Sequence, residues 1–112
     1  MPNGGAPVPV SAARRLNLSP RAIRDIVAIE AYYAQFGLVT ADRVIADIKA
    51  SADSALLNPL IGVEGIRRGT RHIVLRRYPY TIIYRVQRNV IQVVRVLHQR
   101  REYFNPPAGG SR

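Results

Sequence analysis

Hydrophobic and polar positions alternate most clearly between Thr70 and Arg101, where three runs rich in β-branched and aromatic residues are separated by two short turns. Within these runs the apolar residues alternate with arginine, which is typical of antiparallel strands that bury one face. The pattern therefore predicts a three-stranded meander.

The first turn predicts how the first two strands pair. Tyr78-Pro79 reads as a two-residue link, with Arg77 opposite Tyr80 and His72 opposite Arg85. One face of the sheet is then basic and consists of His72, Val74, Arg76, Thr81, Ile83 and Arg85. The other is apolar and is expected to pack on the helices, and it consists of Ile73, Leu75, Tyr80, Ile82, Tyr84 and Val86.

The second turn leaves the third strand open to two interpretations. Arg88-Asn89 is either a two-residue turn or part of a three-residue turn, and the choice decides whether Gln92 or Arg95 lies on the basic face. We favour Arg95 there, because burying an unpaired guanidinium costs more than half-burying an amide.

Two amphipathic helices are predicted before the meander. Ser19-Pro20 combines an N-cap with proline at the first helical position, and an apolar stripe then runs to Phe36. Gly37 ends this helix, and Thr40 is predicted to cap a second helix that runs to Asn58. Because so short a link forces the chain to fold back, the helices should form an antiparallel hairpin.

The remaining segments complete an α+β fold with the helix hairpin on one face of a mainly antiparallel sheet. Residues 14–18 predict a short edge strand, residues 58–69 a loop, and the segment after Leu97 a short helix or turn. Residues 1–13 and 105–112 are predicted to be flexible tails around a single domain at 14–104.

The net charge of +10 is concentrated in the second half of the chain. Residues 1–64 hold six basic and six acidic side chains, whereas residues 65–104 hold ten arginines and only Glu102, a balance of +9. The basic surface is therefore expected on and beside the meander, where arginine suits contacts with phosphates or carboxylates.

Composition also excludes several classes of function. The chain has no cysteine and only two histidines, so disulfides, thiol catalysis and a structural zinc site are not expected, and no cofactor is implied. No apolar run approaches the roughly 20 residues that span a bilayer, and the start of the chain lacks the order of a signal peptide. We expect a cytoplasmic protein that does not enter a membrane.

Five sequence segments, in this order and spacing, resemble the RelE/ParE family of toxins from type II toxin-antitoxin systems. They are LSPRAIRDI (18–26), NPLIG (58–62), GTR (69–71), YPYTIIYRV (78–86) and VVRVLHQRRE (93–102). The resemblance covers residues 14–104. It implies the α+β fold just described and a cognate antitoxin whose acidic C-terminal segment would wrap the toxin.

The family contains two known activities. RelE-like members are ribosome-dependent mRNA endonucleases, and ParE-like members poison DNA gyrase. Aligned on the tyrosines of YPYTIIY, the ribonucleases carry lysines at the positions of His72 and Val74 and an arginine at the position of Thr81. Valine and threonine supply neither the cations nor the proton transfer that ribose-hydroxyl cleavage requires, so the resemblance implies a ParE-like gyrase inhibitor.

Two alternatives to a gyrase inhibitor remain open. A ribonuclease of this fold would rely on the residues near the end of the last strand, namely His98, Arg100, Arg101 and Tyr103. A chain without toxicity would only bind an antitoxin or nucleic acid.

Candidate binding residues follow from the basic face and the C-terminal cluster. For the target or for nucleic acid these are Arg71, Arg76, Arg85, Arg95, His98, Arg100 and Arg101. The alternative is that the arginines form a solvated outer surface that prevents edge-to-edge pairing, and that His98 is a structural hydrogen-bonding residue.

Overall fold

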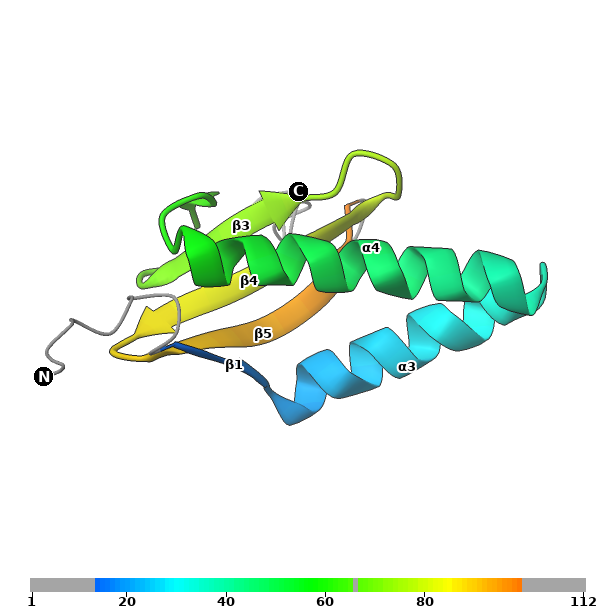
Figure 1. Ribbon diagram of the computed structural model, residues 1–112, viewed down its shortest axis with the longest axis horizontal. Helices are drawn as coiled ribbons and strands as arrows, with labels where there is room; N and C mark the ends of the chain where they lie inside the picture. Colours follow the sequence, from blue (N-terminus) through cyan, green and yellow to red (C-terminus); the bar gives the residue numbers. More distant parts are fainter. Residues whose placement is uncertain (1–13, 66, 100–112) are drawn as a thin grey trace, which may run out of the picture.

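The computed structural model describes residues 14–65 and 67–99, in which two helices cover one face of a five-stranded sheet (Figure 1). The elements are β1 (Arg15–Leu18), α3 (Pro20–Ala34), α4 (Leu38–Leu57), β2 (Val63–Glu64), β3 (Thr70–Val74), β4 (Tyr80–Gln87) and β5 (Val90–His98). This is the predicted α+β fold. Both predicted tails, and the chain beyond Gln99, lie outside the described residues.

The strand order is β1-β5-β4-β3-β2, and only the pairing of β1 with β5 is parallel. The N-terminal edge strand and the meander were both predicted. The two-residue strand β2 was not, because Val63 and Glu64 lie among glycines in a segment too short to show an alternating pattern.

The predicted register between β3 and β4 is wrong by two residues. Val74 pairs with Thr81, His72 with Ile83 and Thr70 with Arg85, so a loop of residues 76–79 replaces the two-residue link. A two-residue hairpin turn needs a positive φ at its centre, which proline does not adopt. Because the error is an even number of residues, each strand residue keeps its predicted face, but Arg76 leaves the sheet and His72 does not face Arg85.

The turn between β4 and β5 is the two-residue form, since Gln87 pairs with Val90. A β-bulge follows, in which Tyr84 pairs with Val93 and Ile83 pairs with Arg95. The bulge moves the second half of β5 by one residue, so Gln92 and Arg95 both lie on the face away from the helices. Treating these two residues as exclusive alternatives was therefore wrong, although the placement of Arg95 was right.

The helices begin and end close to the predicted positions. The Ser19 hydroxyl accepts a hydrogen bond from the Ala22 amide at 3.0 Å, as expected of an N-cap. The predicted Thr40 cap is wrong: α4 begins at Leu38, directly after Gly37, whose φ of 116° lets the chain reverse without a longer link. The Thr40 hydroxyl instead donates to the Phe36 carbonyl at 3.3 Å.

The core lies between the helix hairpin and the face of the sheet predicted to be apolar. Ile82 and Tyr84 are fully buried there, with Leu75 and Tyr80 beside them. They pack in clusters with helix residues that were predicted to meet the sheet: Ile26, Ile29, Tyr33, Val44, Ile45 and Ile48. Val86, which was also predicted to be buried, is 39% exposed near the end of β4.

Tyr84 also fixes the loop between α4 and β2. Its hydroxyl donates to the Pro59 carbonyl at 2.7 Å and accepts from the Gly62 amide at 3.0 Å. A side chain at position 62 would meet the Tyr84 hydroxyl at 2.8 Å, so glycine is required for this close approach. Arg71 donates to the Gly62 carbonyl at 2.6 Å and holds the loop from its other side.

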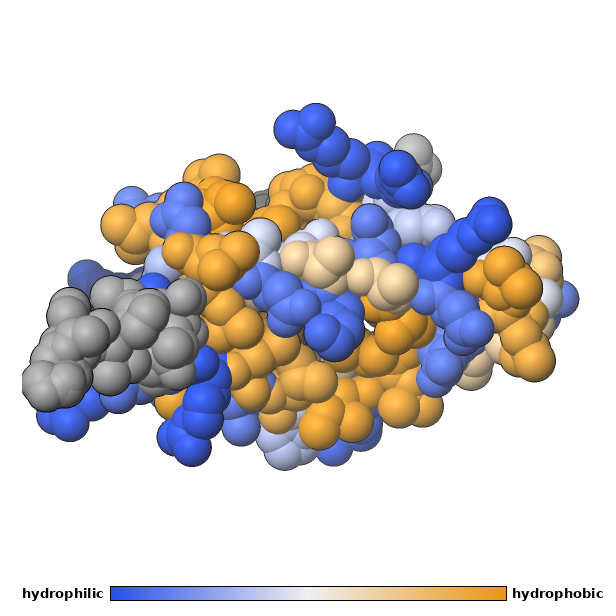
Figure 2. All heavy atoms as spheres, viewed as in Figure 1, coloured by the Kyte–Doolittle hydropathy of each residue, from blue (hydrophilic) through white to orange (hydrophobic). Residues whose placement is uncertain are grey.

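The outer surface of the helix hairpin carries many apolar side chains. Figure 2 shows them gathered along the helix layer and at the tip of the hairpin, which Figure 1 shows extending beyond the strands. The exposed residues on these helices and their link are Ile23, Val27, Tyr32, Phe36, Leu38, Val39 and Leu57.

The assignment of the two sheet faces is tested by truncating one residue on each. We expect Ile82→Ala to lower the free energy of unfolding by about 2 to 5 kcal/mol, because Ile82 is fully buried in the core. Val74→Ala is the matched control, since Val74 is 54% exposed on the other face, and it should cost less than about 0.5 kcal/mol. Chemical denaturation measures both, and similar losses would contradict the assignment.

Candidate functional site

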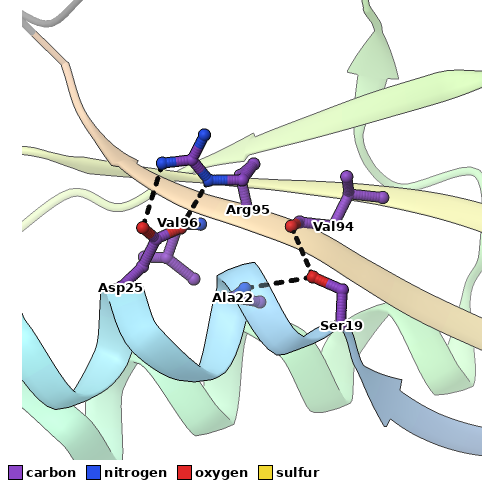
Figure 3. A network of polar contacts seen from close by, with 6 residues as sticks. All are labelled: Ser19, Ala22, Asp25, Val94, Arg95 and Val96. Carbon is purple, nitrogen blue, oxygen red and sulfur yellow. Dashed lines mark hydrogen bonds and ion pairs between the residues drawn. The ribbon is translucent and has the colours of Figure 1, made fainter.

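The seam between α3 and β5 is the part of the structure where the predicted site residues meet the helices. β1 pairs with β5 only as far as Val93, and the start of α3 then follows the strand edge. The Ser19 amide donates to the Val93 carbonyl at 2.9 Å. Figure 3 shows the Ser19 hydroxyl, which donates to the Val94 carbonyl at 2.7 Å. One serine therefore both caps the helix and satisfies the edge of the strand.

Asp25, nearly two helical turns further along α3, continues this seam. Its carboxylate accepts hydrogen bonds from Arg95 Nε at 2.8 Å and Nη2 at 3.0 Å, and from the Val96 amide at 2.9 Å (Figure 3). The exposed fractions of the Arg95 and Asp25 side chains are 22% and 15%, so this bidentate ion pair is largely shielded from water. Arg95 starts on the far face of the sheet by its register, and its guanidinium reaches the helix at the edge.

A groove of about 600 Å³ lies beside this ion pair. Its walls include Tyr32 and Tyr33 from α3, and Tyr80 and His98 from the paired strands β4 and β5. The aromatic rings meet edge to face, with centroids 5.0 Å apart for Tyr32 and Tyr33 and 5.5 Å apart for Tyr80 and His98. The groove therefore combines edge-to-face aromatic rings with the Asp25–Arg95 ion pair.

The arrangement favours binding over acid-base chemistry. The Asp25 carboxylate already accepts three hydrogen bonds, two of them from the Arg95 guanidinium. Both of its oxygens therefore have partners within the protein, and neither is directed at a substrate. The part of the chain that the structure describes contains no group of three or more His, Asp or Glu residues able to hold a metal ion.

The structure brings together only some of the predicted site residues. Arg95 and His98 line the same groove. Arg71 was predicted near the edge of the basic face, but it pairs with Tyr84 on the helix side and binds the loop carbonyls, so this placement is wrong. Arg76 lies in the β3–β4 loop, and Arg85 lies on the far face between Thr70 and Gln92. The other three candidates, Arg100, Arg101 and Tyr103, lie outside the described residues.

The middle of the far face is not basic. Thr81 and Ile83 point away from the helices and are nevertheless buried, with 0% and 3% of their surface exposed. Burial also lowers the pKa of His72 below its ordinary value of 6.5. At neutral pH this face therefore has no fixed positive charge at positions 72, 74 and 81.

Sequence reasoning missed Asp25 and Tyr32 as members of the site. Asp25 lies in the LSPRAIRDI segment, but nothing in its spacing from Arg95, seventy residues away, indicates a contact. The pairing depends on where the bulge places Arg95 and on how α3 lies along the strand edge, and both are tertiary features.

Comparison with known proteins places this geometry in a family. Residues 16–103, which include the whole seam and groove, match the family described as the ParE toxin of the type II toxin-antitoxin system parDE. The chain belongs to the ParE toxin family. It is also 32% identical over 90 residues to the Sinorhizobium fredii protein Y4kP, whose name marks it as a candidate toxin. That alignment covers 80% of this chain and 93% of the relative.

Two solved structures share the fold of this ParE family member. A chain of the chromosomal ParDE toxin-antitoxin system from P. aeruginosa matches with a TM-score of 0.70 and 25% identity, over 77% of this chain and 96% of that one. A chain of the RelBE2 toxin-antitoxin complex from Mycobacterium tuberculosis matches in fold, with a TM-score of 0.55, 22% identity, and coverage of 76% and 96%. The chain is therefore a type II toxin-antitoxin toxin of the ParE/RelE family.

The helices of the described residues do not include one long and apolar enough to cross a membrane.

The role of Asp25 in the seam is tested by removing its carboxylate. Asp25→Ala should lower the free energy of unfolding by about 2 to 3 kcal/mol, because it leaves a shielded guanidinium and the Val96 amide without their acceptor. Asp25→Asn keeps one acceptor oxygen and should cost less.

The control for Asp25 is Glu30→Ala on the same helix, where an exposed carboxylate is removed at a cost below about 0.5 kcal/mol. Urea unfolding of the three variants gives these values. Equal costs for Asp25→Ala and Glu30→Ala would mean that the ion pair does not stabilise the seam.

The lowered pKa of His72 predicts a pH dependence of stability. As the pH falls below 6.5, the unfolded chain binds a proton on this residue before the folded chain does, so the free energy of unfolding should decrease towards the folded-state pKa. Denaturation between about pH 8 and pH 5 measures this, with His72→Gln as the comparison. The variant should lose less stability than the native chain, and parallel curves would contradict the prediction.

Proposed function

We propose that this ParE family member inhibits DNA gyrase by binding it, without chemistry of its own, and that a cognate antitoxin neutralises it. The observation that carries the proposal is the state of positions 72, 74 and 81 on the far face. They hold a histidine whose pKa is lowered by burial, an exposed valine and a fully buried threonine. None of them supplies the cation that stabilises a cleaved phosphate in the ribonuclease branch.

The α3–β5 groove supports the same conclusion. The Asp25 carboxylate in the groove is bound by Arg95, and the other walls combine aromatic and aliphatic side chains, which suits contact with a protein surface. The apolar residues exposed on the hairpin add to the area available for such contacts. Surfaces of this kind fit an inhibitor that works by occupying its target.

Two observations support a cognate antitoxin as partner: the structural neighbours and the charge of the chain. The two structural neighbours are described as parts of the ParDE and RelBE2 toxin-antitoxin systems. Residues 65–104 of this chain carry a balance of +9, which suits a partner segment rich in acidic residues. The proposed target and the proposed antitoxin would both be met in the cytoplasm.

The proposal is tested by two assays run in parallel with the purified chain. Gyrase supercoiling should fall as the protein is added, while ribosomes programmed with a defined message should show no new 3′ ends. Addition of the co-encoded antitoxin should restore supercoiling. Expression without the antitoxin should block DNA replication before translation fails.

The matched variants remove two arginines each. Arg100→Ala with Arg101→Ala should weaken gyrase inhibition if the C-terminal cluster contacts the target, whereas Arg21→Ala with Arg24→Ala on the exposed side of α3 should not. Codon-positioned cuts with unchanged supercoiling would replace the proposal with a RelE-like endonuclease. A protein inactive in both assays would be a non-toxic module that binds antitoxin or nucleic acid.

A further inference from the structure

Five arginines converge at the end of the sheet where β1 and β3 begin. Two lie in the β2–β3 turn, one in the β4–β5 turn, one at the start of β1 and one on β4, namely Arg67, Arg68, Arg88, Arg15 and Arg85. We call these the turn-end arginines. Figure 1 shows both turns and the start of β1 at this end of the molecule.

Hydrogen bonds fix this convergence. The Arg15 amide donates to the Asn89 carbonyl at 2.7 Å, which joins β1 to the β4–β5 turn. The Thr70 amide donates to the Arg67 carbonyl at 3.1 Å, and Thr70 pairs with Arg85 across the sheet. The row therefore spans β1 to β3, which is three strand spacings or about 14 Å.

The row has no acidic counterpart among the described residues. Five of the six described carboxylates are on α3 and α4, which cover the other face, and Glu64 pairs with Arg71, whose side chain is also on the helix side. None of the turn-end arginines forms an ion pair with a described carboxylate. The neighbours of Arg85 on its own face are the neutral residues Thr70 and Gln92.

Two of the turn-end arginines have features that are unfavourable for folding. The Arg85 Nε atom is buried without a hydrogen-bond partner among the described residues. Arg88 has a φ of 32°, in the left-handed region where glycine or asparagine is favoured in a tight turn. The two-residue turn requires a positive φ, and an arginine in place of glycine or asparagine puts a charge at this exposed position.

We propose that the turn-end arginines bind the sugar-phosphate backbone of nucleic acid. Duplex DNA carries one negative charge per about 1.7 Å of axis, so a row of this length faces several phosphates at once. Arginine binds phosphate oxygens through two parallel hydrogen bonds, so the guanidinium groups of the row supply the donors. Contacts to phosphates fix the position of a protein on nucleic acid and carry no sequence information, so binding of this kind is expected to be independent of sequence.

This surface is at the opposite end of the sheet from Val74 and Thr81, two of the three positions that distinguish the ribonuclease branch, whereas the third, His72, is two residues from Thr70. β3 begins at the turn-end arginines with Thr70 and finishes at Val74, which pairs with Thr81 at the opposite end of the sheet. The proposed site therefore goes beyond gyrase inhibition, and it stands or falls independently of it.

The test is the fluorescence anisotropy of a labelled duplex DNA of mixed sequence and of a single-stranded RNA of the same length, titrated with the purified chain over a series of salt concentrations. The logarithm of affinity should fall linearly with the logarithm of salt concentration. Arg67→Ala with Arg68→Ala should reduce that slope for DNA by about 2 and weaken binding by about tenfold at low salt.

Two comparisons separate this site from net charge and from misfolding. Arg21→Ala with Arg24→Ala removes the same charge from exposed positions on α3 and should change affinity by less than about twofold. Arg88→Gly should weaken binding while leaving the melting temperature unchanged or higher, because glycine relieves the left-handed φ.

The outcomes decide the proposal. The proposal is supported if the chain binds one or both nucleic acids and only the turn-end variants lose affinity. The nucleic acid that binds then identifies the source of the phosphate. Equal losses in the two double variants, no binding at low salt, or displacement by polyglutamate as effective as by unlabelled DNA would overturn it. Displacement by polyglutamate would indicate that the turn-end arginines bind an acidic protein segment.

Discussion

The hydrogen bonds of the Asp25 carboxylate to β5 fix where α3 lies, and the rest of the structure depends on this placement. β1 is too short to cover the whole outer edge of β5, so the backbone groups beyond Val93 need partners from another element. Ser19 and Asp25 supply them from one helix. This fixes α3 along the sheet edge, and α4 follows because Gly37 allows only a tight reversal.

The bulge in β5 belongs to the same arrangement. Where β5 leaves β1, the strand shifts by one residue relative to β4, which turns Arg95 to the face away from the core and lets its guanidinium reach Asp25 at the edge. Without the shift, the alternation of the strand would direct Arg95 into the apolar core. The groove with His98 and Tyr80 lies beside this contact. The bulge therefore affects both the shape of the groove and the hydrogen bonds that satisfy the edge of β5.

The two ends of the sheet differ in chemistry. At one end the far face presents valine and buried threonine, and at the other the two turns gather arginine with neutral polar neighbours. The β3–β4 loop beyond Val74 also carries Arg76 and Arg77, so both ends of the sheet have arginine in their turns, while the strand positions 74 and 81 are uncharged.

The sequence by itself determined the elements and the layers. Helix caps, the alternation of apolar and basic residues and the tight helix link are local signals, and they were enough for the hairpin, the meander and the face that Ile82 buries. Register and pairing are decided by contacts between distant residues, and these only the tertiary structure revealed. The proline in the first turn excluded the expected register, the bulge placed both Gln92 and Arg95 on one face, and Asp25 met Arg95 across seventy residues of chain. The prediction for Arg71 was wrong for the same reason. Its guanidinium binds the carbonyl of Gly62, in a loop that the sequence did not place beside β3.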